Sequence, residues 1–304
     1  MDPVLPSPGD VIDGCYELEL LAAQGGMGTV WRARDVLLGA TVALKIVDCT
    51  HPGVRARFRS EAAALSMLSH DAIVRYAGHG SSRARPGCSW IVTEWIEGES
   101  LAERLARGPL ALDETVALAL RLSEGLGAVH ARGMAHRDVK PGNVMLPAGR
   151  LDEAKLVDFG IACGHWGDVA EDGVVMGTAG YMAPERACSR GEVDARCDVY
   201  SLGCLLFECL TGRSAFAVDD DSGWSAVMQL DEAPRVSELV AGVPPELDEL
   251  VARMLSAVPE ERPADGNAVH AWLRALSAAV PMITGASRPR SSPSRAPEAL
   301  ASCA

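Results

Sequence analysis

The pattern of hydrophobic residues changes from strand-like to helical near Ser100, and this change restricts the possible folds more than any other feature. Before Ser100, short runs rich in Val, Leu and aromatic residues alternate with glycine-containing turns, as in antiparallel strands. Residues 54–70 differ, because they combine apolar residues at helical spacing with strong helix formers. We therefore predict a small antiparallel sheet with one main helix. Its five strands are expected at residues 16–24, 28–35, 41–48, 72–80 and 88–96.

The chain after Ser100 is predicted to be mostly helical. Ser100 and Glu103 have the spacing of a capping box, and a long amphipathic helix should start at Asp113 and stop near Gly133. One later segment is apolar nearly all round, as expected for a helix buried in the core of a lobe. This segment and two further helices are expected at residues 198–212, 245–256 and 265–277.

The two patterns together predict an α+β protein of two lobes. The small five-stranded N-lobe precedes a larger, mostly helical C-lobe, and a Ser-, Pro- and Arg-rich tail is expected to be disordered. The predicted divisions are an N-terminal extension at 1–15, the N-lobe at 16–96, the C-lobe at 97–284 and the tail at 285–304.

Composition excludes several classes of protein. Of 304 residues, 48% are hydrophobic and 23% are charged, which favours a folded protein over a disordered one. The net charge of −13 argues against a nucleic-acid-binding surface. No apolar run approaches the roughly 20 residues that span a bilayer, and the N-terminus lacks a signal-peptide pattern. The nine cysteines are odd in number and have no C-x-x-C pair, so we predict a cytoplasmic protein without membrane or nucleic-acid partners.

A glycine-rich turn and a lysine suggest a site for phosphate. Gly25, Gly26 and Gly28 lie between two predicted strands, where their backbone N–H groups could close over phosphate oxygens. Taken alone, the turn is more typical of an ordinary hairpin. Lys45 ends the apolar run VALK, and a buried lysine requires an anionic partner. Glu61 on the following helix and phosphate oxygens are both candidates.

Two further stretches carry oxygen and nitrogen groups suited to phosphate chemistry. In HRDVKPGN, Asp138, Lys140 and Asn143 can converge on one small volume. A carboxylate can orient a hydroxyl and accept its proton, while a lysine can neutralise a phosphoryl group. Asp158 of LVDFG is expected beside Asn143, and these two oxygen ligands suit Mg²⁺, which also keeps waters and phosphates.

Several short motifs follow one another along the chain, in the order GGMGTV, VALK, HRDVKPGN, DFG, GTAGYMAPE, DVYSLG and PEERP. In that order the sequence resembles eukaryotic-like (Hanks-type) bacterial serine/threonine protein kinases, from about Tyr16 to about Leu276. The resemblance implies a two-lobed kinase fold that binds ATP with Mg²⁺, or Mn²⁺ in its place, and acts on protein substrates. A transient homodimer would allow autophosphorylation.

The resemblance also implies roles for individual residues. Lys45 would hold the α and β phosphates and pair with Glu61. Asp138 would be the catalytic base or the group that orients the hydroxyl, and Lys140 would contact the transferred phosphate. Asn143 and Asp158 would bind the metal ion. The remaining nucleotide contacts would come from Gly25, Gly26, Gly28, Val30, Ala43, Thr93 and the backbone of Glu94 and Ile96.

Other matched positions are expected to be structural or to concern the protein substrate. Glu185 should pair with Arg262, Asp198 should anchor the backbone of the catalytic loop HRDVKPGN (residues 136–143), and His136 should pack rather than react. Lys140 and the segment GTAGYMAPE resemble serine/threonine rather than tyrosine kinases. Thr178 would then contact Asp138 and Lys140.

The sequence departs from the family pattern at two places. Ala23 stands where the glycine loop usually has glycine, which could weaken ATP binding modestly. The stretch 161–178 has no hydroxyl before Thr178, so the usual phosphorylated residue that pairs with Arg137 is missing. Either an acid of the loop replaces the phosphate, from among Asp168, Glu171 and Asp172, or the loop is simply a solvated acidic segment.

A catalytically weak signalling scaffold of the same shape is the alternative function. A scaffold has no chemical need for Lys45, Glu61, Asp138, Asn143 and Asp158 together, so their joint presence favours an active kinase.

Overall fold

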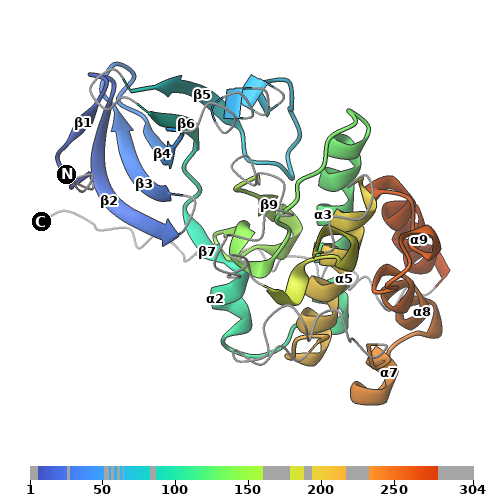
Figure 1. Ribbon diagram of the computed structural model, residues 1–304. Coiled ribbons are helices and arrows are strands. Elements are labelled where there is room, and N and C mark those ends of the chain that lie inside the picture. The colour runs from blue at the N-terminus through green and yellow to red at the C-terminus, as the bar shows by residue number, and fades with distance from the viewer. Residues whose placement is uncertain are drawn as a thin grey trace, which may run out of the picture.

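The computed structural model consists of a curled sheet beside a larger helical region, joined near the strand β7 (Gly98–Ser100) (Figure 1). It describes residues 6–25, 28–50, 55, 58–59, 62–63, 65–82, 87–159, 179–187, 194–216 and 233–279. This arrangement confirms the predicted two-lobed α+β fold. Within the described residues, no helix is both long and apolar enough to cross a bilayer.

The N-lobe sheet contains the five predicted strands and one more. Its order is β1-β2-β3-β4-β6-β5, and every neighbouring pair is antiparallel. The extra edge strand arises because two residues of the N-terminal segment pair with Tyr16 and Glu17. The strands are β1 (Val11–Ile12), β2 (Tyr16–Gly25), β3 (Gly28–Asp35), β4 (Thr41–Asp48), β5 (Tyr76–Ser81) and β6 (Cys88–Glu94).

The described residues between 55 and 66 are helical, as predicted for the main helix of this lobe. Phe58, Ala62 and Leu65 are buried at a spacing of three to four residues, which is the period of a helix face directed at a core. They belong to the same apolar cluster as Ile91 of β6 and the helices of the C-lobe.

The C-lobe is built around the buried helix α5 (Arg196–Thr211), which ends at the left-handed Gly212. Helix α2 (Leu101–Leu105) begins with the predicted capping box of Ser100 and Glu103. Helix α3 (Leu112–His130) begins one residue ahead of the expected Asp113, and the Glu114 side chain caps the backbone nitrogen of Ala111. The remaining helices are α4 (Pro184–Ala187), α7 (Val236–Leu239), α8 (Pro245–Met254) and α9 (Gly266–Ala279).

Short elements place the polar loops between the lobes. Strands β7, β8 (Val144–Pro147) and β9 (Lys155–Leu156) form a small second sheet. Leu156 of β9 also exchanges backbone hydrogen bonds with Ala72 and Val74, just ahead of β5. The short helices of this lobe are η1 (Pro141–Asn143), η2 (Leu151–Glu153), η3 (Ala179–Tyr181) and η4 (Pro259–Glu261).

Candidate active site

One face of the N-lobe sheet carries the residues predicted to contact a nucleotide. Lys45 lies opposite both Val30 and Ile91, and Ala43 lies opposite Thr93. Directly opposed residues point to the same face of a sheet, as does every second residue along a strand. Val30, Ala43, Lys45 and Thr93 therefore share one face. The other face forms the separate core of the lobe, with Trp31, Leu44 and Val92 buried in it.

Gly25 and Gly28 pair across the end of the β2–β3 hairpin. Gly28 has φ +127°, and a Cβ there would lie 2.0 Å from the carbonyl oxygen of Ile46, so only glycine fits. Ala23 is exposed, lies opposite Val30 and lacks a positive φ. The backbone at Ala23 thus accommodates a methyl group without strain.

Lys45 forms an ion pair with Asp158, 113 residues further along the chain. The side chain of Lys45 is 12% exposed and that of Asp158 is 32% exposed. A cation this buried requires a counter-charge, and here the predicted metal ligand supplies it. The sequence interpretation considered Glu61 and phosphate as partners, but not Asp158.

Asp138, Lys140 and Asn143 converge as predicted. The Asp138 Oδ2 atom accepts hydrogen bonds from Lys140 Nζ at 2.9 Å and from Asn143 Nδ2 at 2.6 Å. Asn143 Nδ2 also donates to the backbone oxygen of Asp138 at 2.8 Å. The amide nitrogen of Asn143 faces Asp138, which turns its Oδ1 away from that carboxylate. This oxygen can therefore serve a cation.

Asp198 holds the backbone on which this loop is built. It is fully buried in α5, and its two carboxylate oxygens accept from the backbone nitrogens of His136 at 2.6 Å and Arg137 at 2.7 Å. Burial opposes its charge, but the hydrogen bond from His130 and nearby charges outweigh this and lower the pKa of Asp198. The predicted anchoring role of Asp198 thus agrees with its contacts, and His130 is a partner that the sequence did not indicate.

His136 is packed rather than exposed to reactants. Its Nε2 lies 3.1 Å from the backbone oxygen of Val157, and its ring lies 4.4 Å from that of Phe159. Complete burial disfavours the imidazolium and lowers the pKa of His136, although the carboxylates of Asp198 and Asp138 oppose the shift.

This pKa shift predicts a dependence of stability on pH. The unfolded chain takes up a proton at His136 below its ordinary pKa of 6.5, whereas the folded chain does not. The contribution of His136 to stability is therefore complete above that pH and is lost as the pH falls, by up to about 1.4 kcal/mol per unit. His136→Phe should reduce the slope of the unfolding free energy between pH 6.5 and 5.5, measured by urea titration. Equal slopes in both proteins would contradict this.

A second ion pair between the lobes was not predicted. Glu94, at the end of β6, accepts hydrogen bonds from Lys155 Nζ of β9 and from the backbone nitrogen of Arg75 at 2.9 Å. Ile96, two residues further along the chain, is half-buried. These contacts connect the end of β6, which was predicted to contact adenine, with β9. Strand β9 in turn precedes Asp158 in the chain. One sequence signal was available, since Lys155 stands between the buried residues Ala154 and Leu156, much as Lys45 interrupts an apolar strand.

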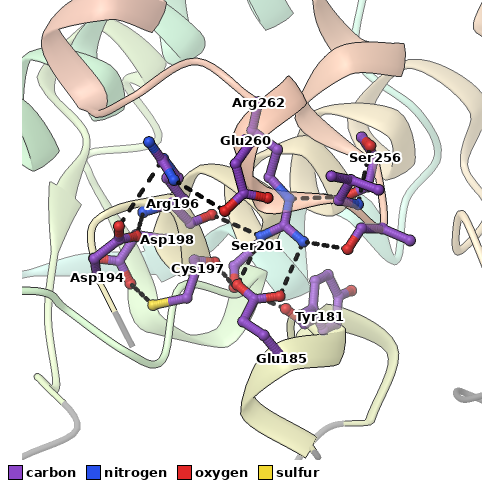
Figure 2. A network of polar contacts seen from close by, with 12 residues as sticks. Tyr181, Glu185, Asp194, Arg196, Cys197, Asp198, Ser201, Ser256, Glu260 and Arg262 are labelled. Carbon is purple, nitrogen blue, oxygen red and sulfur yellow. Dashed lines mark hydrogen bonds and ion pairs between the residues drawn. The ribbon is translucent and has the colours of Figure 1, made fainter. Parts of the chain in front are cut away.

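The predicted pair of Glu185 and Arg262 is present and bidentate. Arg262 donates from Nη1 and Nη2 to the two carboxylate oxygens at 2.7 and 2.9 Å, as Figure 2 shows. Its side chain is fully buried, and its guanidinium also lies 4.9 Å from the centre of the Tyr200 ring. Nearby, Ser201 Oγ donates to the backbone oxygen of Tyr181 at 2.7 Å. The hydrogen bond from Ser201 and the ion pair with Arg262 therefore hold the segment 179–187 against α5 and the end of η4.

Several predicted residues lie outside the described part of the chain. They are Gly26, Glu61, Asp168, Glu171, Asp172 and Thr178.

Residues 16–273 match the family described as the protein kinase domain. The chain is 38% identical over 279 residues to the serine/threonine-protein kinase PknL of Mycobacterium tuberculosis, covering 90% of this chain and 68% of that protein.

The chain belongs to the protein kinase family. It is a serine/threonine protein kinase of the bacterial, eukaryotic-like type, and a scaffold function receives no support from its relatives.

Solved structures show the same fold. The kinase domain of Mycobacterium tuberculosis PknI superposes with a TM-score of 0.71 at 23% identity, covering 90% of this chain and 100% of that one. Rad53 residues 1–466 in complex with AMP-PNP give a TM-score of 0.68 at 24% identity, covering 85% of this chain and 65% of that one. Members of this family use ATP and a divalent metal ion and act on protein substrates.

Proposed function

We propose that this kinase transfers the γ-phosphate of ATP to Ser and Thr hydroxyls with Asp138 as the group that orients the hydroxyl and accepts its proton. One observation supports this most directly: the Asp138 carboxylate is held at 2.9 Å from Lys140 Nζ and 2.6 Å from Asn143 Nδ2. A fixed carboxylate can act on a hydroxyl without reorganising. Lys140, on the same oxygen, is placed to neutralise charge on the transferred group.

The nucleotide is proposed to lie against the sheet face that carries Val30, Ala43, Lys45 and Thr93. The backbone of Glu94 and Ile96 would bind adenine, and the loop of Gly25, Gly26 and Gly28 would cover the phosphates. Lys45 would hold the α and β phosphates, which are natural partners for a buried cation. The structural similarity to Rad53, solved in complex with AMP-PNP, supports nucleotide binding by this chain.

Asp158 and Asn143 are proposed as the protein ligands of the metal ion. One carboxylate and one amide oxygen suit Mg²⁺, which retains water and phosphate ligands. These two residues fit a metal ion because the Asp158 carboxylate is partly exposed. The amide nitrogen of Asn143 is directed to Asp138, which leaves the Asn143 Oδ1 atom for the ion. The bound ion would neutralise developing charge on the phosphates. Mn²⁺ is the alternative ion.

On the substrate side, Thr178 is proposed to position the acceptor together with Asp138 and Lys140. The net charge of −13 favours substrates with basic flanking residues. We also propose that the chain acts in the cytoplasm and autophosphorylates through a transient homodimer.

The function is tested by transfer of labelled γ-phosphate to one basic peptide synthesised with Ser, Thr or Tyr as its only hydroxyl. Label on the Ser and Thr peptides, but not on the Tyr peptide, is expected with Mg²⁺. Replacing Mg²⁺ with Mn²⁺ compares the two ions. Absence of transfer with both ions, while ATP still binds, would instead support the scaffold function.

The kinase is further proposed to work without phosphorylation of its activation loop, the segment between DFG and APE that contains residues 161–178. Arg137, which usually pairs with a phosphorylated loop residue in this family, would instead pair with Asp168, Glu171 or Asp172. A carboxylate has less charge and fewer acceptor oxygens than a phosphate, so this pairing should be weaker.

Changing Asp168, Glu171 and Asp172 together to the corresponding amides should therefore lower kcat, by about 3- to 10-fold if one charge-assisted hydrogen bond is lost. The rate is measured with the Ser peptide, and mass spectrometry establishes whether residues 161–178 carry phosphate. The matched control changes Asp152 and Glu153, exposed acids of η2, to amides. A triple variant as fast as the wild type would contradict the proposal that an acidic residue of the loop takes the place of a phosphate group.

A further inference from the structure

Arg137 has a backbone conformation that its surroundings must enforce. Its φ is +69°, in the left-handed region that residues other than glycine seldom adopt. Such a residue persists where neighbouring contacts determine its position, and it costs free energy to hold. Asp138 follows directly, so the orientation of the Arg137 peptide group sets the starting direction of the Asp138 side chain.

The amide side of Arg137 is held by Asp198, through the hydrogen bond of 2.7 Å from the Arg137 nitrogen. The carbonyl side is held by a different residue. Arg186 donates from Nη1 to the Arg137 oxygen, across 49 residues of sequence. A buried anion and a buried cation thus hold the two sides of one strained residue.

Arg186 reaches the loop because its own segment is firmly anchored. It is 8% exposed and lies in α4, directly after Glu185. Glu185 binds the fully buried Arg262, and Figure 2 shows this pair with Ser201 and Tyr181 around it. Consecutive residues of α4 therefore contact different parts of the lobe: Glu185 contacts Arg262, and Arg186 contacts the catalytic loop.

We propose that Arg186 is a positioning residue for Asp138, and that it couples the segment 179–187 to the catalytic loop. The inference rests on the kinase activity, and it adds a residue outside the motifs that identify the family. A shift of α4 would move the Arg186 guanidinium away from the Arg137 carbonyl and release the backbone ahead of Asp138. The position of the segment after the activation loop would thereby affect the phosphotransfer rate.

The variant Arg186→Met keeps much of the side-chain volume but donates no hydrogen bond. It should lower kcat by about 10- to 100-fold, because small misplacements of a catalytic group are costly. The KM for ATP should change by less than about twofold, since Arg186 forms no hydrogen bond or ion pair with the proposed nucleotide contacts among the described residues. Arg186→Lys retains a donor and should lose less, about 3- to 10-fold.

The matched control is Arg121→Met, which removes a part-buried arginine that also donates to a distant backbone oxygen, that of Ala154 at 3.2 Å. Its kcat should equal that of the wild type. Amide hydrogen exchange gives a readout that does not need turnover: residues 136–139 should exchange faster in the Arg186 variants, while α5 stays protected.

Unchanged exchange at 136–139 in a folded Arg186 variant would overturn the proposal, even if the wild type transferred no phosphate. A kcat within about twofold of an active wild type in Arg186→Met would also overturn it, as would equal rates for the Lys and Met variants. If Arg186→Met does not fold, Arg186→Lys is tested by both readouts against the same criteria. If the wild type itself transfers no phosphate, the proposed kinase activity fails, and this result is distinct from a failure of the Arg186 proposal.

Discussion

Replacing Asp138 with Asn should lower kcat by about 10²- to 10⁴-fold, the usual contribution of a positioned acid or base. The amide cannot accept the proton of a hydroxyl. The substitution also removes the negative charge of the carboxylate, whose Oδ2 atom accepts hydrogen bonds from Lys140 and Asn143. The loop should keep its shape, because Asn143 also binds the Asp138 backbone oxygen and Asp198 holds the preceding residues.

The measurement is steady-state transfer to the Ser peptide, with ATP affinity determined by direct titration. ATP affinity should be close to that of the wild type, since no proposed nucleotide contact is changed. Asp152→Asn provides the matched control, because Asp152 is exposed and pairs only with Arg150 within the described residues. A folded Asp138→Asn variant that retains more than about a tenth of the wild-type kcat would disprove the proposed role.

Breaking the pair of Glu185 and Arg262 should give the largest loss of stability. Arg262 is fully buried and also donates from Nε to the backbone oxygen of Ser256 at 2.7 Å. In Glu185→Gln its charge would stay buried without a counter-ion, which typically costs about 3–5 kcal/mol. Domains of this kind are stable by only about 5–15 kcal/mol, so this loss would be a large part of the total.

Urea titration of Glu185→Gln, Arg262→Met and the double variant measures this effect. The double variant should lose less than the sum of the single losses, because no uncompensated charge remains. Glu249→Gln with Arg253→Met is the control, since that pair is exposed and should not shift the midpoint measurably. Additive losses at Glu185 and Arg262 would show that the two charges do not depend on each other.

Local sequence patterns predicted much of the fold. The alternation of short apolar runs with glycine turns located β2 to β6, and the Ser100–Glu103 spacing located the start of α2. Both features depend on residues a few positions apart. The start of α3 was predicted to within one residue, although Glu114 rather than Asp113 caps the preceding backbone.

The order of the motifs likewise identified the family and the convergence of Asp138, Lys140 and Asn143, which lie within one short loop. The edge strand β1 was not predicted, because two residues carry no detectable period and pair only once β2 offers an open edge.

The sequence by itself thus determined most of the secondary structure, the family and the types of groups in the site. The tertiary structure alone decided which distant charges meet: Lys45 with Asp158, Glu94 with Lys155, and Arg186 with the Arg137 carbonyl. These contacts join residues separated by 113, 61 and 49 positions. Sequence patterns report the local period and burial of an element, whereas the partner of a buried charge depends on how whole elements pack against one another.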